Sequence, residues 1–195
     1  ARLERAGYDV PEGRIGERTV EVVVSPGELR ELRAAGLELT LVAVGRPFAK
    51  IQAEQAGPEQ VGAVPAGYLD LSQLVAAMSS SAAAHPAICA LHDVTASYAA
   101  PATWNGRSIH ALKLSDNVAV DEDEPEVLIV ANYHAREIVT PVIALHAVNQ
   151  LTSLYGTDPQ VTALVDTHEI WIVPVCNPDG YEHVFSVDNL WRKNR

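Results

Sequence analysis

The chain has 195 residues, of which 48% are hydrophobic, and a formal net charge of -11 from 14 basic and 25 acidic residues. A chain of this length and composition can bury a substantial core, which excludes a disordered or low-complexity protein. Its negative charge would repel nucleic acids and anionic membranes at long range, so we expect neither as a partner. No apolar run approaches the roughly 20 residues that a membrane helix needs.

Residues 1–45 predict a small strand-helix-strand unit. Residues 19–24 (TVEVVV) alternate and are rich in β-branched side chains, which favours a strand. Residues 25–36 (SPGELRELRAAG) begin with a serine cap and a proline suited to the first helical position, and they end in glycine, so they predict a short helix. Residues 37–44 (LELTLVAV) then predict a second strand.

The middle of the chain predicts a linker and the start of a larger unit. Residues 46–67 contain several glycines and prolines and no sustained period, which indicates a linker. Residues 68–86 predict a helix, because Leu, Val and Met recur on one face before a His-Pro stop. Residues 87–91 and 108–114 predict two strands around a polar turn, most simply an antiparallel pair.

The last third of the chain predicts an α/β arrangement. Residues 126–132 (EVLIVAN) and 169–175 (EIWIVPV) are nearly continuous in apolar side chains, which indicates buried strands. Between them Pro141 begins a helix that Gly156 ends, and a second helix follows Asp158. The sequence therefore predicts a mixed, mostly parallel sheet flanked by helices.

The two cysteines, Cys89 and Cys176, lie inside or at the end of apolar β-rich runs, where small buried thiols pack well. They lack the CxxC spacing of a structural zinc or redox site. We expect core thiols, and the sequence leaves open whether the two pair.

The segment YHARE, residues 133–137, follows the predicted strand 126–132. The carboxyl ends of such strands are where open α/β sheets present ligands and catalytic groups. His134 and Glu137 stand three positions apart, so in a turn after the strand their side chains emerge on the same side. An imidazole nitrogen and a carboxylate oxygen so placed can chelate Zn²⁺. The pair alone is a weak motif, since two residues of a surface loop have the same spacing.

Two further motifs give the pair its context. Residues 177–183 (NPDGYEH) follow the second buried strand, and residues 189–195 (NLWRKNR) come next. Turn chemistry alone accounts for an isolated NPDG. The series HxRE, helix, apolar strand, NPDGYEH and WRKNR, however, resembles the zinc carboxypeptidase family, the M14 metallopeptidases. The resemblance covers about residues 68–195, which we expect to be part of a catalytic domain.

The resemblance implies roles for four residues. His134 and Glu137 resemble the first two zinc ligands, and Arg136 resembles an arginine that helps to hold a longer peptide. Arg192 resembles the arginine that polarises the scissile carbonyl and stabilises the oxyanion, a role that suits a permanently charged guanidinium. The implied activity is hydrolysis of C-terminal peptide bonds by a metal-activated water, with Zn²⁺ as cofactor.

The resemblance also implies substrates, location and the character of the N-terminal unit. The expected partners are the C-termini of peptides or proteins, and the expected location is extracellular after secretion. Residues 1–45 resemble, more loosely, the small domain that precedes the catalytic one in some of these enzymes.

The sequence departs from the family pattern after the WRK motif. The third zinc ligand, the catalytic Glu, the Tyr that closes over the substrate and the Asn-Arg pair that binds the terminal carboxylate have no matching positions. Asn194 and Arg195 belong to the WRKNR stretch and do not take over that last role. We therefore expect a fragment with half an active site and with a sheet edge or face left exposed.

Three other functions remain open at this stage. One is a zinc amidohydrolase acting on small N-acyl amino acids, since such enzymes share HxxE, although NPDGYEH and WRKNR favour the peptidase. Another is a non-catalytic relative that keeps Arg136 and Arg192 to hold peptide carboxylates and binds peptides whether or not a chelator is present. The last is an α/β domain without a site.

Overall fold

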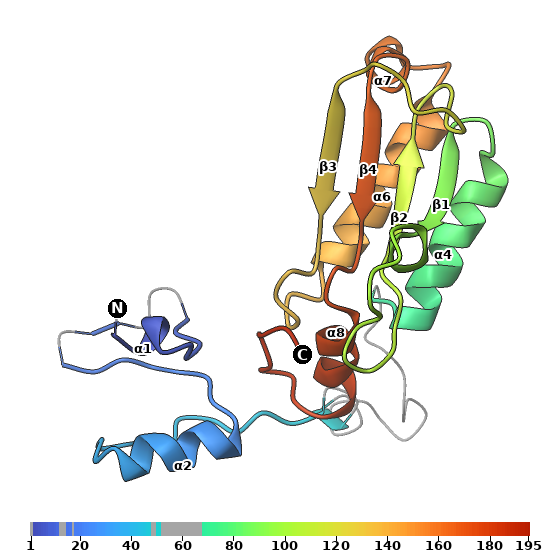
Figure 1. Ribbon diagram of the computed structural model, residues 1–195. Coiled ribbons are helices and arrows are strands. Elements are labelled where there is room, and N and C mark those ends of the chain that lie inside the picture. Colours follow the sequence, from blue (N-terminus) through green and yellow to red (C-terminus); the bar gives the residue numbers. More distant parts are fainter. Residues whose placement is uncertain (1, 12–14, 17, 48–49, 52–67) are drawn as a thin grey trace.

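The centre of the protein is a four-stranded sheet with the strand order β1-β2-β4-β3. The computed structural model describes residues 2–11, 15–16, 18–47, 50–51 and 68–195 (Figure 1). The strands are β1 Cys89–Asp93, β2 His110–Leu114, β3 Glu126–Val130 and β4 Glu169–Val173. β2 pairs antiparallel with β1 and with β4, whereas β3 and β4 are parallel. The predicted mixed sheet and its antiparallel β1-β2 pair are confirmed. Among the four described strands only β3 and β4 pair in parallel, so this part of the sheet is mostly antiparallel and not mostly parallel as predicted.

Helices α4 and α6 contact one another and pack on the sheet, where they enclose the main core (Figure 1). That core joins Met78 of α4 and Val148 of α6 to Leu112 and Ile172 of the strands. None of the described helices is long and apolar enough to cross a membrane. The helices are α1 Arg2–Arg5, α2 Pro26–Ala34, α4 Leu71–Ala84, α5 Val94–Ser97, α6 Thr140–Leu154, α7 Pro159–Val165 and α8 Pro178–Ser186.

Of the helices that the sequence predicts, α2, α4 and α7 begin at side-chain caps, whereas α6 begins without one. The Asp70 carboxylate accepts a hydrogen bond from the Gln73 amide, and the Gln73 side chain accepts one from the Asp70 amide, which fixes the start of α4. Asp158 caps α7 in a similar way. α6 ends just before Gly156, whose φ of +76° is the left-handed conformation that glycine adopts without strain.

Strand β3 is one of the two outer strands of the described sheet, β1 being the other. It connects through α6 and α7 to β4, its parallel neighbour, as the strand-helix-strand pattern predicts. The prediction that this strand is buried is wrong, because all five of its residues are exposed, with Leu128 at 67%. The reason is that the described helices α4 and α6 pack on β1, β2 and β4, so the faces of β3 lack comparable cover. The expected exposed sheet edge therefore lies at β3.

The N-terminal unit contains the predicted helix but not the predicted strands. The Ser25 hydroxyl caps α2 together with the Glu28 carboxylate. Residues 19–24 form only two isolated bridges, and residues 37–44 form none. Apolar alternation produces a strand only where another strand pairs with it. The division at residue 45 stays a prediction, and most of the predicted linker, residues 52–67, lies outside the described residues.

Both cysteines are free thiols. Cys89 is buried in the main core, and this burial raises the pKa of its thiol to about 11. The expectation of core packing is thus confirmed for Cys89, whereas Cys176 is half-buried.

Candidate metal and substrate site

The carboxyl ends of β3 and β4 point to the same edge of the sheet, next to α8 and the last residues of the chain (Figure 1). Their pairing extends past the strands, because the Ala131 amide donates to the Val173 carbonyl at 2.9 Å and the Cys176 amide donates to the Ala131 carbonyl at 3.2 Å. The loops that follow the two strands therefore leave the sheet side by side. One loop carries HARE and the other begins NPDGYEH.

His134 and Glu137 lie together in the turn after β3. Nδ1 of His134 is 2.8 Å from Oε1 of Glu137, and the two side chains are 30% and 45% exposed. The Glu137 amide donates to the His134 carbonyl at 3.1 Å, which closes the turn. The prediction that both side chains emerge on the same side is confirmed.

The chain's last residues contact both loops. The Ala135 amide donates to the Arg192 carbonyl at 3.0 Å, and Nη1 of Arg136 donates to the Leu190 carbonyl at 3.2 Å. From the other loop, Nδ2 of Asn177 donates to the Lys193 carbonyl at 3.1 Å. The three motifs HARE, NPDGYEH and WRKNR are thereby joined by hydrogen bonds into one region.

The Arg192 side chain contacts the N-terminal unit. Its Nη1 lies 3.2 Å from Oδ1 of Asp9, whose side chain is only 2% exposed. Beside it, Nζ of Lys193 lies 2.5 Å from Oε1 of Glu28. A carboxylate of the N-terminal unit is thus paired with the Arg192 guanidinium, which the family resemblance assigns to the substrate carbonyl.

The NPDG segment forms the first turn of α8 rather than an isolated turn. The Asn177 side chain accepts from the Gly180 amide at 3.0 Å and so caps the helix. Asp179 is buried and accepts from the Asn105 amide and from the Arg107 guanidinium, each at 2.8 Å. Burial raises the pKa of Asp179, but these hydrogen bonds outweigh it and hold the pKa below its ordinary value.

The donor set of His134 and Glu137 fits zinc. Both side chains present a nitrogen or oxygen atom to the same point, and imidazole and carboxylate are ordinary zinc donors. Within the part of the chain that the structure describes, no third His, Cys, Asp or Glu joins them at ligand distance. A catalytic zinc site uses three protein ligands, so this pair is one donor short of that number among the described residues.

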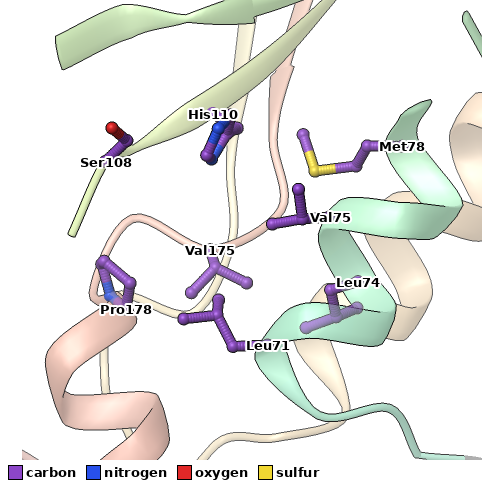
Figure 2. A pocket seen from close by; sticks show the side chains of 8 residues that line it. All are labelled: Leu71, Leu74, Val75, Met78, Ser108, His110, Val175 and Pro178. Carbon is purple, nitrogen blue, oxygen red and sulfur yellow. The ribbon is translucent and has the colours of Figure 1, made fainter.

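An apolar pocket lies between α4 and the start of α8 but offers no room for a substrate. Figure 2 shows Leu71, Leu74 and Met78 of α4 facing Val175 and Pro178. The free volume is about 10 Å³, which holds at most one water molecule. This pocket is a narrow gap between packed core side chains and not a binding site.

Comparison with known proteins identifies the family. The sequence profile of the family described as "Zinc carboxypeptidase" matches residues 74–195. This chain belongs to the zinc carboxypeptidase family. Members of the family use Zn²⁺, the metal that the donor set of His134 and Glu137 fits. The resemblance inferred from HARE, NPDGYEH and WRKNR is confirmed.

Individual zinc carboxypeptidases match to different extents. A protein named "Zinc carboxypeptidase" from Saccharothrix mutabilis subsp. capreolus is 38% identical over 204 residues, which cover 100% of this chain and 45% of that protein. "Inactive metallocarboxypeptidase ECM14" of Saccharomyces cerevisiae is 36% identical over 94 residues, 48% of this chain and 22% of that protein. The chain therefore spans less than half the length of these relatives.

A solved structure confirms the fold. The carboxypeptidase A from Helicoverpa armigera aligns with a TM-score of 0.63 and 24% identity, covering 100% of this chain and 48% of the other. The mixed sheet flanked by helices is thus the zinc carboxypeptidase arrangement.

Sequence reasoning missed several residues that support this site. Asp9 contacts Arg192 from 183 positions away, and no local pattern indicates that pairing. Arg107 and Asp179 are 72 positions apart and pair in the same way. Asn132 had a local signal, since an asparagine directly after an apolar strand is one of the residues that tolerate a left-handed turn.

Proposed function

We propose that this chain is part of a zinc-dependent metallocarboxypeptidase that hydrolyses C-terminal peptide bonds. The observation that carries the proposal is the His134-Glu137 pair, which presents two zinc donors in the turn at the carboxyl end of β3. The hydrogen bonds from the Ala135 amide to the Arg192 carbonyl and from Arg136 to the Leu190 carbonyl support it, because they hold the backbone of WRKNR against this turn.

Each residue of the pair and its neighbours has a proposed role. Nδ1 of His134 and Oε1 of Glu137 hold the metal, which when bound supplies Lewis acidity toward water and the peptide carbonyl. Arg192 donates hydrogen bonds to the oxygen on which negative charge develops. Arg136, held by the Leu190 carbonyl beside the same turn, binds a carbonyl or carboxylate of a longer peptide.

The remaining groups of the site are proposed to lie in a segment that follows residue 195. The third ligand, the general base and the clamp for the terminal carboxylate belong to this segment, and so does the pocket that selects the C-terminal side chain. The coverage of 45% of the Saccharothrix protein supports this division. Secretion, which the family resemblance implies, stays a prediction.

The test is release of the C-terminal residue from an N-blocked peptide by the longer protein that we propose contains this chain. Activity should need a free peptide carboxylate and zinc, disappear with a chelator, and fall at least about 100-fold in His134→Ala, because one ligand of the metal is lost. His146→Ala is the matched control, since His146 is exposed on α6 and should leave the rate unchanged. Chelator-resistant activity, or full activity of His134→Ala, would refute the proposal.

The second candidate is a non-catalytic protein that binds peptide carboxylates. It is favoured by one observation, that a 36% identical relative carries the name "Inactive metallocarboxypeptidase ECM14". In that case Arg136 and Arg192 would bind peptides equally well with and without a chelator, and no residue would be released. The same peptide assay, with binding measured beside hydrolysis, separates the two.

A further inference from the structure

The turn that carries His134 and Glu137 begins at a buried asparagine in an unusual conformation. Asn132 is 1% exposed and has a φ of +54°, in the left-handed region that few residues other than glycine adopt. It follows Ala131, whose backbone still pairs with β4. The chain therefore leaves the sheet abruptly at Asn132, and the direction of the following turn depends on this residue.

The Asn132 carboxamide binds the backbone of the turn from inside. Its Nδ2 donates to the carbonyl oxygens of His134, at 3.3 Å, and of Ala135, at 3.2 Å. Among the described residues nothing donates to its buried Oδ1. Burying an unpaired oxygen costs free energy that an apolar residue of similar size would avoid, so the two donated bonds are what this side chain contributes.

Thr140 joins the two ends of the same turn. Its hydroxyl accepts from the Asn132 amide at 2.9 Å and donates to the Glu137 carbonyl at 2.8 Å. The Thr140 amide donates to that same carbonyl at 3.0 Å. One hydroxyl thus connects Asn132, two positions before His134, to Glu137, which carries the second donor side chain.

We propose that Asn132 and Thr140 are positioning residues that hold His134 and Glu137 in the geometry of zinc ligands, an inference that rests on the proposed function. Neither side chain touches the metal in this account. They act on the backbone of the turn, so that the two donors already face each other before metal binds. Groups that orient metal ligands in this way commonly change metal affinity by roughly 10-fold to 100-fold when removed.

The experiment measures the zinc dissociation constant of the 195-residue chain by competition with a chromophoric chelator. Thr140→Val keeps the shape but removes the bridging hydroxyl, and should weaken binding about 10-fold or more, whereas Thr140→Ser should stay within about twofold. Asn132→Gly keeps access to positive φ without the carboxamide and should weaken binding about 10-fold, and Asn132→Ala should do so further, because alanine is strained at this φ.

Thr152→Val is the matched control for a purely structural effect. Thr152 is buried on α6, and its hydroxyl donates to the Val148 carbonyl at 2.9 Å, away from the turn. Its replacement should lower thermal stability without changing zinc affinity. If Thr140→Val loses stability as Thr152→Val does but binds zinc like wild type, the positioning role is wrong.

Amide hydrogen exchange without zinc separates failure of this inference from failure of the proposed function. In Thr140→Val the amides of Ala135 and Glu137 should exchange about 10-fold faster, while those of the β3-β4 ladder stay protected. If wild type binds zinc no better than His134→Ala, the proposed zinc site is wrong. Hydrogen exchange then still tests whether Asn132 and Thr140 hold the turn. Unchanged exchange at both amides overturns the inference.

Discussion

Gly180, in the first turn of α8, lies close to the HARE turn. A Cβ at this position would come within 2.6 Å of the Asn177 carboxamide atoms and within 2.8 Å of the Ala135 Cβ. Asn177 caps α8, and Ala135 belongs to the HARE turn. The missing side chain is therefore what allows the cap of α8 to pack against the turn that carries the zinc donors.

Gly180→Ala should lower the free energy of unfolding by about 1–3 kcal/mol, because a methyl group enters a space that is already filled. Urea unfolding followed by circular dichroism measures the change. Gly27→Ala in α2 is the control, since its Cβ would meet only Ser25 Oγ at 3.7 Å, an ordinary contact. A Gly180→Ala variant as stable as wild type would mean that the loops do not pack as described.

For single residues, spacing along the sequence predicted the two candidate zinc donors but not the residues that hold them in place. His134 and Glu137 stand three apart in a turn, and that distance along the chain determines that they face one way. Asn132 and Thr140 bind backbone atoms, which every residue has, so their contacts leave no pattern of residue types in the sequence. The Arg192-Asp9 pair depends on how distant parts of the chain meet.

A buried ion pair joins β2 to β4 at the element scale. Nζ of Lys113 lies 2.6 Å from Oε1 of Glu169, with side-chain exposures of 5% and 2%, and the same oxygen accepts from the Glu122 amide at 2.9 Å. Burial raises the pKa of Glu169, but the hydrogen bonds from Lys113 and from the Glu122 amide, together with the Lys113 charge, outweigh it, so the pKa lies below its ordinary value.

Glu169→Gln should lower the free energy of unfolding by about 3 kcal/mol or more at neutral pH, because it leaves the Lys113 charge buried without its partner. A carboxyl group whose pKa is lowered by folding stabilises the fold at pH values above its ordinary pKa of about 4.3. This stabilisation is lost as the pH falls through the lower pKa of the folded state. The difference between wild type and variant should therefore shrink in acid.

Urea unfolding at a series of pH values measures this difference. The double variant Lys113→Met with Glu169→Leu is the control and should regain much of the lost stability, since it removes both charges. A difference between wild type and Glu169→Gln that stays constant in acid would contradict the assignment.

The elements were predictable where local signals and tertiary structure agree. Helices α2 and α7 begin at the predicted caps, Ser25 and Asp158, and the buried run of β4 is a strand. α8 was missed because an asparagine followed by proline and glycine also suits a turn. Residues 37–44 have the composition of a strand but no strand to pair with, and a single sequence does not reveal that lack.

At the scale of the whole molecule, the N-terminal unit is attached to the candidate site by two ion pairs. Asp9 contacts Arg192 and Glu28 contacts Lys193, the two basic residues of the WRK motif. Burial raises the pKa of Glu28, but the hydrogen bonds from Lys193 and Ser25, together with the Lys193 charge, outweigh it, so the pKa is lowered. Charge therefore contributes to holding Asp9 and helix α2 of the N-terminal unit against the site.

Asp9→Asn combined with Glu28→Gln should weaken this attachment, because both carboxylates lose their charge while keeping their shape. Limited proteolysis should then cleave the N-terminal unit several-fold faster, and raised salt should speed cleavage more in wild type than in the variant, since salt screens the pairs. Glu38→Gln, at an exposed position of the same unit, is the control. Equal cleavage of all three proteins would contradict an electrostatic attachment.

The most direct test of the account is zinc binding by the chain itself, compared among wild type, His134→Ala, Glu137→Ala and the control His146→Ala. Metal analysis after dialysis gives the stoichiometry, and competition with a chromophoric chelator gives the affinity. The account predicts one zinc for wild type and His146→Ala, and affinity at least about 10-fold weaker in the other two, because each has lost one of two ligands. Equal binding by all four proteins would contradict the claim that the turn after β3 is a metal site.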